Sequence, residues 1–203
     1  MNRTIITGIA ALSLAVLPCA TANAEAAGAD FDGDGRTDPV SLQQVSEDSM
    51  LLRVGLAEEF VDAEVPGNAQ GQPVLPTDVN GDGSDEVMVP EAVGANTITY
   101  TVWGYSAERG LHPVRTADGQ PLRLFEGGGA RAVSSYSCGP ADATRALVSV
   151  NAYAADDELY RGERVTYTVR DGLATVVEQV AVEGAQRDDP RLQADPATCA
   201  PLA

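Results

Sequence analysis

A nine-residue acidic loop that occurs twice constrains this chain more than any other feature. Residues 30–38 read DFDGDGRTD and residues 78–86 read DVNGDGSDE, so both follow the pattern D-x-[DN]-G-D-G-x-x-[DE]. Side-chain oxygens stand at positions 1, 3, 5 and 9, with glycine at positions 4 and 6. Glycine adopts the positive φ angles of a tight turn, which lets alternate side chains point toward one centre. The pattern predicts a short loop that wraps a hard cation.

Each loop offers the oxygen ligands that calcium requires. Calcium takes about six to eight oxygens at about 2.3–2.6 Å, and a flexible loop with many ligands favours it over magnesium. Zinc prefers histidine and cysteine, and the single histidine, His112, stands far along the chain from any cysteine. The ligands that we expect for two calcium ions, including the backbone carbonyls of Arg36 and Ser84, are Asp30, Asp32, Asp34, Arg36, Asp38, Asp78, Asn80, Asp82, Ser84 and Glu86.

Position 12 excludes two helical relatives of this loop. An EF-hand needs a bidentate glutamate there and a helix after it, and dockerin-type loops also use an acid at that position. Position 12 is Ser41 in the first loop and Val89 in the second, and valine-containing segments follow both loops. A metal-free Asp/Gly turn between two strands is the remaining alternative. Two loops with every ligand position filled favour calcium over that alternative.

The rest of the sequence after residue 24 reads as short strands separated by Gly, Asp, Asn and Pro. Runs rich in β-branched and aromatic residues, several of them alternating with period two, are typical of strands. The strands that we expect are residues 40–42, 50–54, 86–89, 97–103, 146–150, 165–169 and 175–182. Apart from a turn near residues 57–61, no stretch has a sustained helical period. The sequence therefore predicts an all-β fold.

An internal repeat indicates three similar units. Residues 99–102 and 166–169 both read TYTV, and each copy is followed by a turn that ends in Gly-Leu. In the second copy, Asp171-Gly172 predicts a two-residue type I′ hairpin. Residues 138–142 occupy the place of an acidic loop and predict a third loop that has lost its acids. Within a domain of residues 25–187, followed by a tail of residues 188–203, we expect units near residues 30–77, 78–135 and 136–187.

Acidic loops that lead into a strand resemble the FG-GAP/VCBS repeats of secreted bacterial proteins and of the integrin α-subunit β-propeller. In that family the side chains at positions 1, 3, 5 and 9 and the carbonyl at position 7 bind calcium, which implies the same roles for the ten residues named above. Typical propellers have about four to eight blades, more than three units supply, and the FG-GAP signature does not precede the loops. We expect a compact antiparallel domain of about three blade-like β-hairpin repeats, partly propeller-like. A truncated propeller that dimerises is the alternative.

The first 24 residues are predicted to be a signal peptide. Residues 5–17 form a short apolar run, and residues 22–24 read ANA, which fits the small-x-small rule for cleavage after Ala24. The run is too short for a comfortable membrane span, and no second run follows. Lipid attachment at Cys19 is an alternative, but Pro18 occupies the place of the small residue that it needs. We expect a secreted protein without a membrane span.

Charge and cysteine content agree with an exported protein. The formal net charge is −17, with arginine but no lysine, and such a surface repels nucleic acid and anionic lipid. This composition, rich in Ala, Arg and Asp, resembles that of high-GC actinobacteria. After the predicted cleavage Cys138 and Cys199 remain, and an even count in an oxidising compartment predicts one disulfide between the tail and the middle of the domain. Two free thiols are the alternative.

The function expected from these features is a calcium-stabilised structural or binding/adhesion role without catalysis. The partner is unknown: an extracellular protein, a glycan and a cell-wall polymer are all open. One candidate contact surface is aromatic, although strand aromatics more commonly pack in the core. The aromatic residues concerned are Tyr100, Trp103, Tyr105, Tyr136, Tyr153 and Tyr160.

The competing hypothesis is a secreted, glycan-active hydrolase that works through carboxylates and is stabilised by calcium. Asp156-Asp157-Glu158 and Asp188-Asp189 supply acids outside the loops. A glycosidase needs two carboxyl groups at a defined separation in a cleft, which a sequence does not specify. The chain has no GxSxG, HExxH or phosphate-loop motif. We therefore expect that the protein is not an enzyme.

Overall fold

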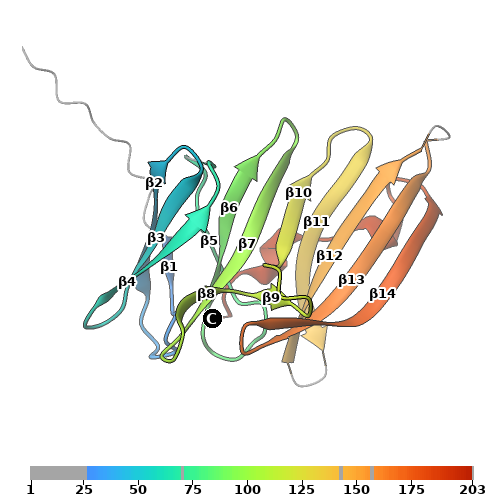
Figure 1. Cartoon of the computed structure of the whole chain (residues 1–203). Coiled ribbons are helices and arrows are strands. Elements are labelled where there is room, and N and C mark those ends of the chain that lie inside the picture. Colours follow the sequence, from blue (N-terminus) through green and yellow to red (C-terminus); the bar gives the residue numbers. More distant parts are fainter. Residues whose placement is uncertain (1–26, 70, 142–143, 156–157, 203) are drawn as a thin grey trace, which may run out of the picture.

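The computed structural model of the protein describes residues 27–69, 71–141, 144–155 and 158–202. Its regular elements are β-strands and two short 3₁₀ helices, so the predicted all-β class is confirmed. The predicted signal peptide lies outside the described residues. Within them, no helix is both long and apolar enough to cross a membrane. Figure 1 shows β6, β7 and β10 to β14 side by side in a row, with β8 and β9 below them.

The first sheet is a four-stranded antiparallel meander. Its strands, in spatial order, are β1 (Ala27–Ala29), β2 (Asp38–Ser46), β3 (Ser49–Gly55) and β4 (Phe60–Pro66). Side chains alternate along β3, so that Met50, Leu52 and Val54 are buried while Arg53 is exposed. On the exposed face Arg53 pairs with Asp62 of β4. The first sheet therefore has one apolar face and one polar face.

The second sheet has ten strands and is antiparallel except where β9 meets β14. Its strands are β5 (Leu75–Thr77), β6 (Glu86–Val93), β7 (Thr97–Ser106), β8 (Gly110–Pro113), β9 (Arg115–Thr116), β10 (Arg123–Gly127), β11 (Ala132–Ala141), β12 (Thr144–Ala154), β13 (Tyr160–Arg170) and β14 (Leu173–Ala185). The spatial order is β5-β6-β7-β10-β11-β12-β13-β14-β9. The first half of β7 pairs with β10 and the second half with β8.

All seven strands predicted from the sequence lie within strands of the structure. The structure adds three longer strands that were not predicted, β4, β10 and β11. Strand β4 includes the end of the segment expected to form a turn near residues 57–61. Its Asp62 and Glu64 weaken the apolar signal, but they alternate with Val61 and Ala63, as expected for a strand with one exposed face.

The predicted hairpin turn joins β13 and β14. Asp171 and Gly172 have φ angles of 50° and 70°. Arg170 and Leu173, on either side, face each other across the hairpin. Positive φ at both central residues is the requirement of a type I′ turn, so this prediction is confirmed.

Three sets of four consecutive strands pair in order, namely β1–β4, β5–β8 and β11–β14. Each set begins a few residues before the corresponding predicted unit, and the second predicted unit also contains β9 and β10. Both TYTV segments lie in the third strand of a set. Gly110-Leu111 begins the fourth strand of its set, whereas Gly172 lies in the turn and Leu173 begins β14. The third loop expected at residues 138–142 is wrong, because residues 138–141 continue strand β11 and pair with β12. A segment with one glycine and no repeated acids has no reason to leave the extended conformation. The described strands close no barrel or propeller.

Three apolar clusters lie on successive faces of the strands. The first contains Val54 of the first sheet and Trp103 of β7. The second contains Met88, on the opposite face of β6 from the first cluster, together with Leu147 of β12. The third contains Val150, on the opposite face of β12 from Leu147. The middle unit is thus buried on both faces, as a central layer must be.

The aromatic side chains belong mainly to these clusters. Four of the six candidate residues are buried, namely Tyr100, Trp103, Tyr136 and Tyr160. Tyr105 is half-buried, and Tyr153 is 62% exposed. A joint aromatic contact patch is therefore wrong, and core packing accounts for most of these residues.

The C-terminal tail packs across the third unit and contains the helices η1 (Pro190–Leu192) and η2 (Pro196–Cys199). Leu192 is buried in the third cluster. Cys199 forms the predicted disulfide with Cys138 of β11, which excludes the alternative of two free thiols. The Cys138 N–H also donates to the Thr198 hydroxyl at 2.9 Å. The tail therefore covers part of β11 and is fixed there covalently.

Candidate metal centre

Glycines give both acidic loops the same local conformation. The first loop joins β1 to β2, and the second joins β5 to β6. Gly33 and Gly35 have φ angles of 72° and 81°, and Gly81 and Gly83 have φ angles of 72° and 96°. Residues with a Cβ rarely adopt these left-handed angles. The glycines at positions 4 and 6 thus form the tight turn that the pattern predicted.

The last acid of each loop is tied back to the second residue. The Phe31 N–H donates to the Asp38 carboxylate at 3.0 Å, and the Val79 N–H donates to the Glu86 carboxylate at 3.0 Å. Phe31 and Val79 are buried apolar residues, and both carboxylates are also buried. Burial raises the pKa of Asp38, an effect that the Phe31 N–H opposes. The position-9 acid of each loop therefore lies in the interior, although burial disfavours its charged form.

Three carboxylates converge in the first loop. One oxygen from each of Asp30, Asp32 and Asp38 lies within 4.8 Å of the other two. Oxygens that share one calcium ion at about 2.3–2.6 Å can be separated by no more than about 5 Å, so this spacing suits calcium. Among the described residues, no other group of three acids, histidines or cysteines meets this distance criterion. The first loop can hold a metal ion with little movement of these side chains.

The fourth predicted acid of the first loop turns outward. The Asp34 carboxylate lies 2.5 Å from the Arg36 guanidinium and also accepts the Arg36 N–H at 2.8 Å. The hydrogen bond to the Arg36 side chain lowers the pKa of Asp34. The N–H of Asp34 itself donates to Asp30 and Asp32. Asp34 must exchange the guanidinium for the cation if it is to become a ligand.

The second loop repeats this backbone arrangement but has an amide at its centre. The Asn80 amide nitrogen donates to Asp82 and to Glu86, both at 2.9 Å. Its oxygen accepts the Asp82 N–H at 2.9 Å, and the Ser84 N–H donates to Asp82 at the matching distance of 2.9 Å. The amide N–H groups occupy the directions from which the two carboxylates would bind a cation. Calcium binding in this loop requires Asn80 to rotate so that its oxygen faces inward.

Among the acids of the two loops, Glu86 has the most strongly perturbed pKa. Burial raises the pKa of its carboxyl group to about 8, against the opposing effect of the Val79 N–H, and the charges of Asp82 and Asp78 add to the rise. A cation at the same place would favour the ionised form by direct charge attraction. The second loop therefore has a position where a proton and a cation compete.

A buried arginine compensates the first acid of the second loop. Arg145 of β12 lies 3.6 Å from the Asp78 carboxylate, and the two side chains are 11% and 5% exposed. The same guanidinium donates to the Asp78 carbonyl at 2.7 Å. The loop sequence gives no sign of this partner, because Arg145 stands in another unit.

The two loops touch through a residue at the variable position 8. The Asp30 N–H donates to the Asp85 carboxylate at 2.8 Å, and the Asp85 N–H donates to the Asp30 carbonyl at 2.6 Å. Burial raises the pKa of Asp85. A Cβ on Gly33 would lie 2.9 Å from the Ser84 hydroxyl, which places the loops in direct contact. The pattern assigns no role to position 8, so sequence reasoning missed Asp85.

His112 lies in β8 beside the second loop. It helps to line a small cavity of about 110 Å³ together with Asp82, Glu86 and Asp171. Its Nδ1 is 2.9 Å from the Gly110 carbonyl, an intra-strand contact. Neither His112 nor a cysteine belongs to the converging acidic group.

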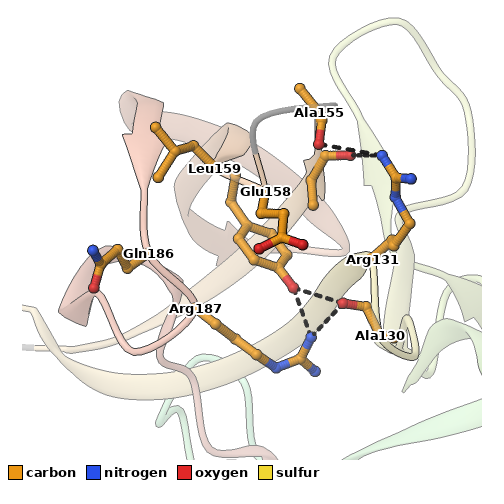
Figure 2. A pocket seen from close by; sticks show the side chains of 9 residues that line it. Ala130, Arg131, Ala155, Glu158, Leu159, Gln186 and Arg187 are labelled. Carbon is orange, nitrogen blue, oxygen red and sulfur yellow. Dashed lines mark hydrogen bonds between the residues drawn. The ribbon is translucent and has the colours of Figure 1, made fainter.

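A larger cavity of about 630 Å³ lies beside the connection between β12 and β13 (Figure 2). Arg187 donates to the Ala130 carbonyl at 3.1 Å and to the buried Tyr160 hydroxyl at 2.7 Å. Glu158 is the only acid among the described residues that line this cavity, and Asp156-Asp157 lie outside the described residues. Of the other acidic pair, Asp189 caps η1 and binds Arg191. No pair of described carboxylates therefore faces across this cavity, as a glycosidase would require.

Comparisons of the chain with family models, with curated proteins and with solved structures found no match. The interpretation of the site thus depends on the chemistry of the loops. Their donor atoms are carboxylate, amide and carbonyl oxygens, which suit a hard divalent cation.

Proposed function

We propose that this protein is a secreted calcium-binding β-repeat protein with a structural or binding/adhesion role, in which calcium stabilises the fold. The observation that carries this proposal is the convergence of Asp30, Asp32 and Asp38 within a loop whose glycine geometry recurs at residues 78–86. Two calcium ions, one in each loop, account for the acids at positions 1, 3, 5 and 9.

The expected role of calcium follows from the place of the loops in the fold. Each loop connects the first strand of a unit to its second, and Asp30 and Asp85 link the loops to each other. Acids that face one another repel when no cation is present, and a cation between them replaces repulsion with attraction. Calcium would therefore stabilise the junction of the two sheets, which is a structural function.

We further propose that the three units are blade-like repeats related to FG-GAP/VCBS repeats. The order of strands within each unit and the equivalent places of the TYTV segments support this relation. Export is supported by the predicted signal peptide together with the Cys138–Cys199 disulfide. The proposed partner is an extracellular protein, a glycan or a cell-wall polymer bound to exposed loops or to a sheet face.

Thermal unfolding tests this proposal. We expect residues 25–203 to melt at a higher temperature in excess calcium than in a chelator. A single site contributes about 2.7 kcal/mol at a hundredfold excess over its Kd, and in a domain of this size that equals roughly 5–10 °C. Asp34→Ala and Asp82→Ala should each remove part of the shift, because each deletes the position-5 ligand of one loop.

Asp48→Ala is the matched control, since Asp48 is an exposed acid in a hairpin turn outside both loops. It should leave the calcium-dependent shift unchanged. An identical melting temperature with calcium and with chelator would contradict the proposal. A shift that survives in the Asp34→Ala, Asp82→Ala double variant would place calcium elsewhere.

A further inference from the structure

The tail meets the second loop at its first ligand position. The Asp78 N–H donates to the carbonyl of Cys199 at 2.9 Å. Cys199 is the tail residue that the disulfide fixes to β11. The backbone that carries the Asp78 carboxylate is therefore attached, through one hydrogen bond, to a covalently anchored residue.

Arg145 forms a second connection between the loop and the tail. Its guanidinium donates to the Asp78 carbonyl at 2.7 Å on one side, and to the carbonyls of Thr198 and Ala200 on the other. A planar guanidinium can donate in several fixed directions at once, a geometry that the ammonium group of lysine lacks. Arg145 thus connects the loop to the tail a second time, in addition to the hydrogen bond between Asp78 and Cys199.

The backbone of β12 supports the loop next to this bridge. The Arg145 N–H donates to the Asn80 carbonyl at 3.0 Å. A Cβ placed on Gly81 would lie 3.3 Å from the Arg145 Cβ, so the loop rests closely on β12. Three of the first four loop positions, 78, 80 and 81, are therefore held by residues outside the loop.

Among the described residues, the first loop has no equivalent support from the tail. Its contacts from outside come from the second loop: Asp85 pairs with the backbone of Asp30, and Ser84 lies beside Gly33. The hydrogen bonds found for its described acids connect them to one another, to Phe31, Gly35 or Arg36, and to the second loop. The two loops are thus built on one pattern but differ in their dependence on the C-terminal tail.

We propose that Arg145 and the disulfide-bonded tail are positioning elements of the second calcium loop, and of that loop alone. The inference rests on the proposed function, because it takes the second loop to bind calcium. With the tail in place, Asp78 and Asn80 are already fixed, and binding has fewer backbone conformations to restrict. Without the tail, the same ligands remain in the sequence but are ordered only when calcium binds.

The test must separate positioning from charge. The double variant Cys138→Ser, Cys199→Ser removes the anchor without changing any charge near the loop. Arg145→Lys keeps the positive charge but removes the fixed directions of the guanidinium. Arg164→Lys is the matched control, since Arg164 donates to the tail carbonyl of Gln193 at 2.8 Å but does not contact the loop.

Each variant is combined with a background that leaves one loop intact. Asp34→Ala disables the first loop and Asp82→Ala disables the second, at the same position of the pattern. Calcium affinity is measured by titration calorimetry. In the Asp34→Ala background we expect the cysteine variant and Arg145→Lys to weaken binding about tenfold, a typical coupling between linked parts of a protein. In the Asp82→Ala background, and for Arg164→Lys in both, we expect less than about a twofold change.

Amide hydrogen exchange without calcium supplies a readout that does not depend on binding. The amides of Val79, Gly81 and Asp82 should exchange faster in the cysteine variant, while those of Asp34 and Gly35 keep their rates. Equal weakening of both loops, or an equal effect of Arg164→Lys, would overturn the inference in favour of general destabilisation. So would unchanged second-loop affinity and exchange. Failure of both backgrounds to bind calcium with the disulfide intact would instead overturn the proposed function.

Discussion

The two acidic loops have the same turn geometry but different surroundings. In the first loop, three carboxylates converge near the surface, and Arg36 holds the fourth. In the second, an asparagine amide lies between two acids, and a buried arginine faces a third. The converging acids of the first loop could hold a metal ion, whereas the acids of the second loop accept hydrogen bonds from Asn80 and face Arg145. A short motif therefore fixes the backbone conformation of a loop. Residues outside the loop decide whether its side chains are free to bind a cation.

The two loops also differ in the pKa values of their acids. The buried Glu86 carboxyl has its pKa raised to about 8, whereas the exposed Asp34 carboxyl has its pKa lowered by Arg36. Burial without a charged partner favours the neutral form, and a guanidinium at hydrogen-bond distance favours the ionised form. The second loop should respond to pH in a range where Asp34 does not.

The largest effect that we expect is a loss of stability with rising pH in the absence of calcium. Because the folded pKa of Glu86 exceeds the unfolded value, the folded state holds the additional proton, and its contribution is lost as pH rises toward 8. Urea unfolding in EDTA at pH 5.5 and pH 8.5 should differ by about 3 kcal/mol from this group. Glu86→Gln should remove that difference, and saturating calcium should suppress it.

Comparing the wild-type protein with Glu86→Gln isolates the Glu86 carboxyl from other groups that titrate in the same range. Those other groups contribute equally to both proteins and cancel when their pH dependences are subtracted. Asp38→Asn is the matched substitution in the first loop. Equal stability of the wild-type protein at both pH values, or an unchanged slope in Glu86→Gln, would contradict the prediction.

An exchange of the position-3 residues should produce the next largest effect. Asn80→Asp gives the second loop the charge of the first, and Asp32→Asn does the reverse. Calcium affinity rises with the number of charged ligands, so we expect about tenfold tighter binding for Asn80→Asp and about tenfold weaker binding for Asp32→Asn, or about 1.4 kcal/mol each. Titration calorimetry is performed with the other loop disabled.

Asn80→Asp should also destabilise the protein without calcium, because the amide that donates to Asp82 and Glu86 is lost. The expected result for Asn80→Asp is therefore tighter calcium binding together with lower stability of the metal-free protein. Affinities that move in the same direction for both substitutions would show that charge count does not distinguish the loops.

The smallest effect should come from Arg36, the exposed arginine of the first loop. Arg36→Ala frees Asp34 from a pair that solvent screens, and such surface pairs contribute little to stability. We expect the unfolding free energy to stay unchanged within the error of the measurement, and calcium affinity of the first loop to rise about twofold as competition for Asp34 ends. Denaturant unfolding and calorimetry measure both quantities. Weaker calcium binding would mean that Arg36 helps to orient Asp34 toward the cation.

Much of the local structure could be predicted from the sequence. Strand β7 follows from a period-two pattern and β3 and β6 follow from short apolar runs, while Asp171-Gly172 specifies its turn because only certain residues tolerate positive φ. The disulfide followed from cysteine count and the expected compartment. The strands and the turn depend on residues that are close in the chain. The disulfide depends on a cysteine count that allows only one pairing.

Other features depend on tertiary contacts that the sequence pattern does not specify. Residues 138–141 resemble the start of a third loop only by their order in the repeat, and pairing with β12 keeps them extended. Strand β11 carries three serines, which weaken the strand signal, yet neighbouring strands supply its hydrogen bonds. Tyr136 could be read as a contact residue or as core until the second cluster was seen to enclose it.

By itself the sequence determined the shape of each acidic loop, because nine consecutive residues contain both the glycines that permit the turn and the acids that its N–H groups bind. Only the tertiary structure decided how those acids are held. Asp85 reaches the first loop from 55 residues away, and Arg145 reaches Asp78 across 67 residues. Burial and charge compensation depend on such distant partners, and so two loops of one pattern acquire different chemistry.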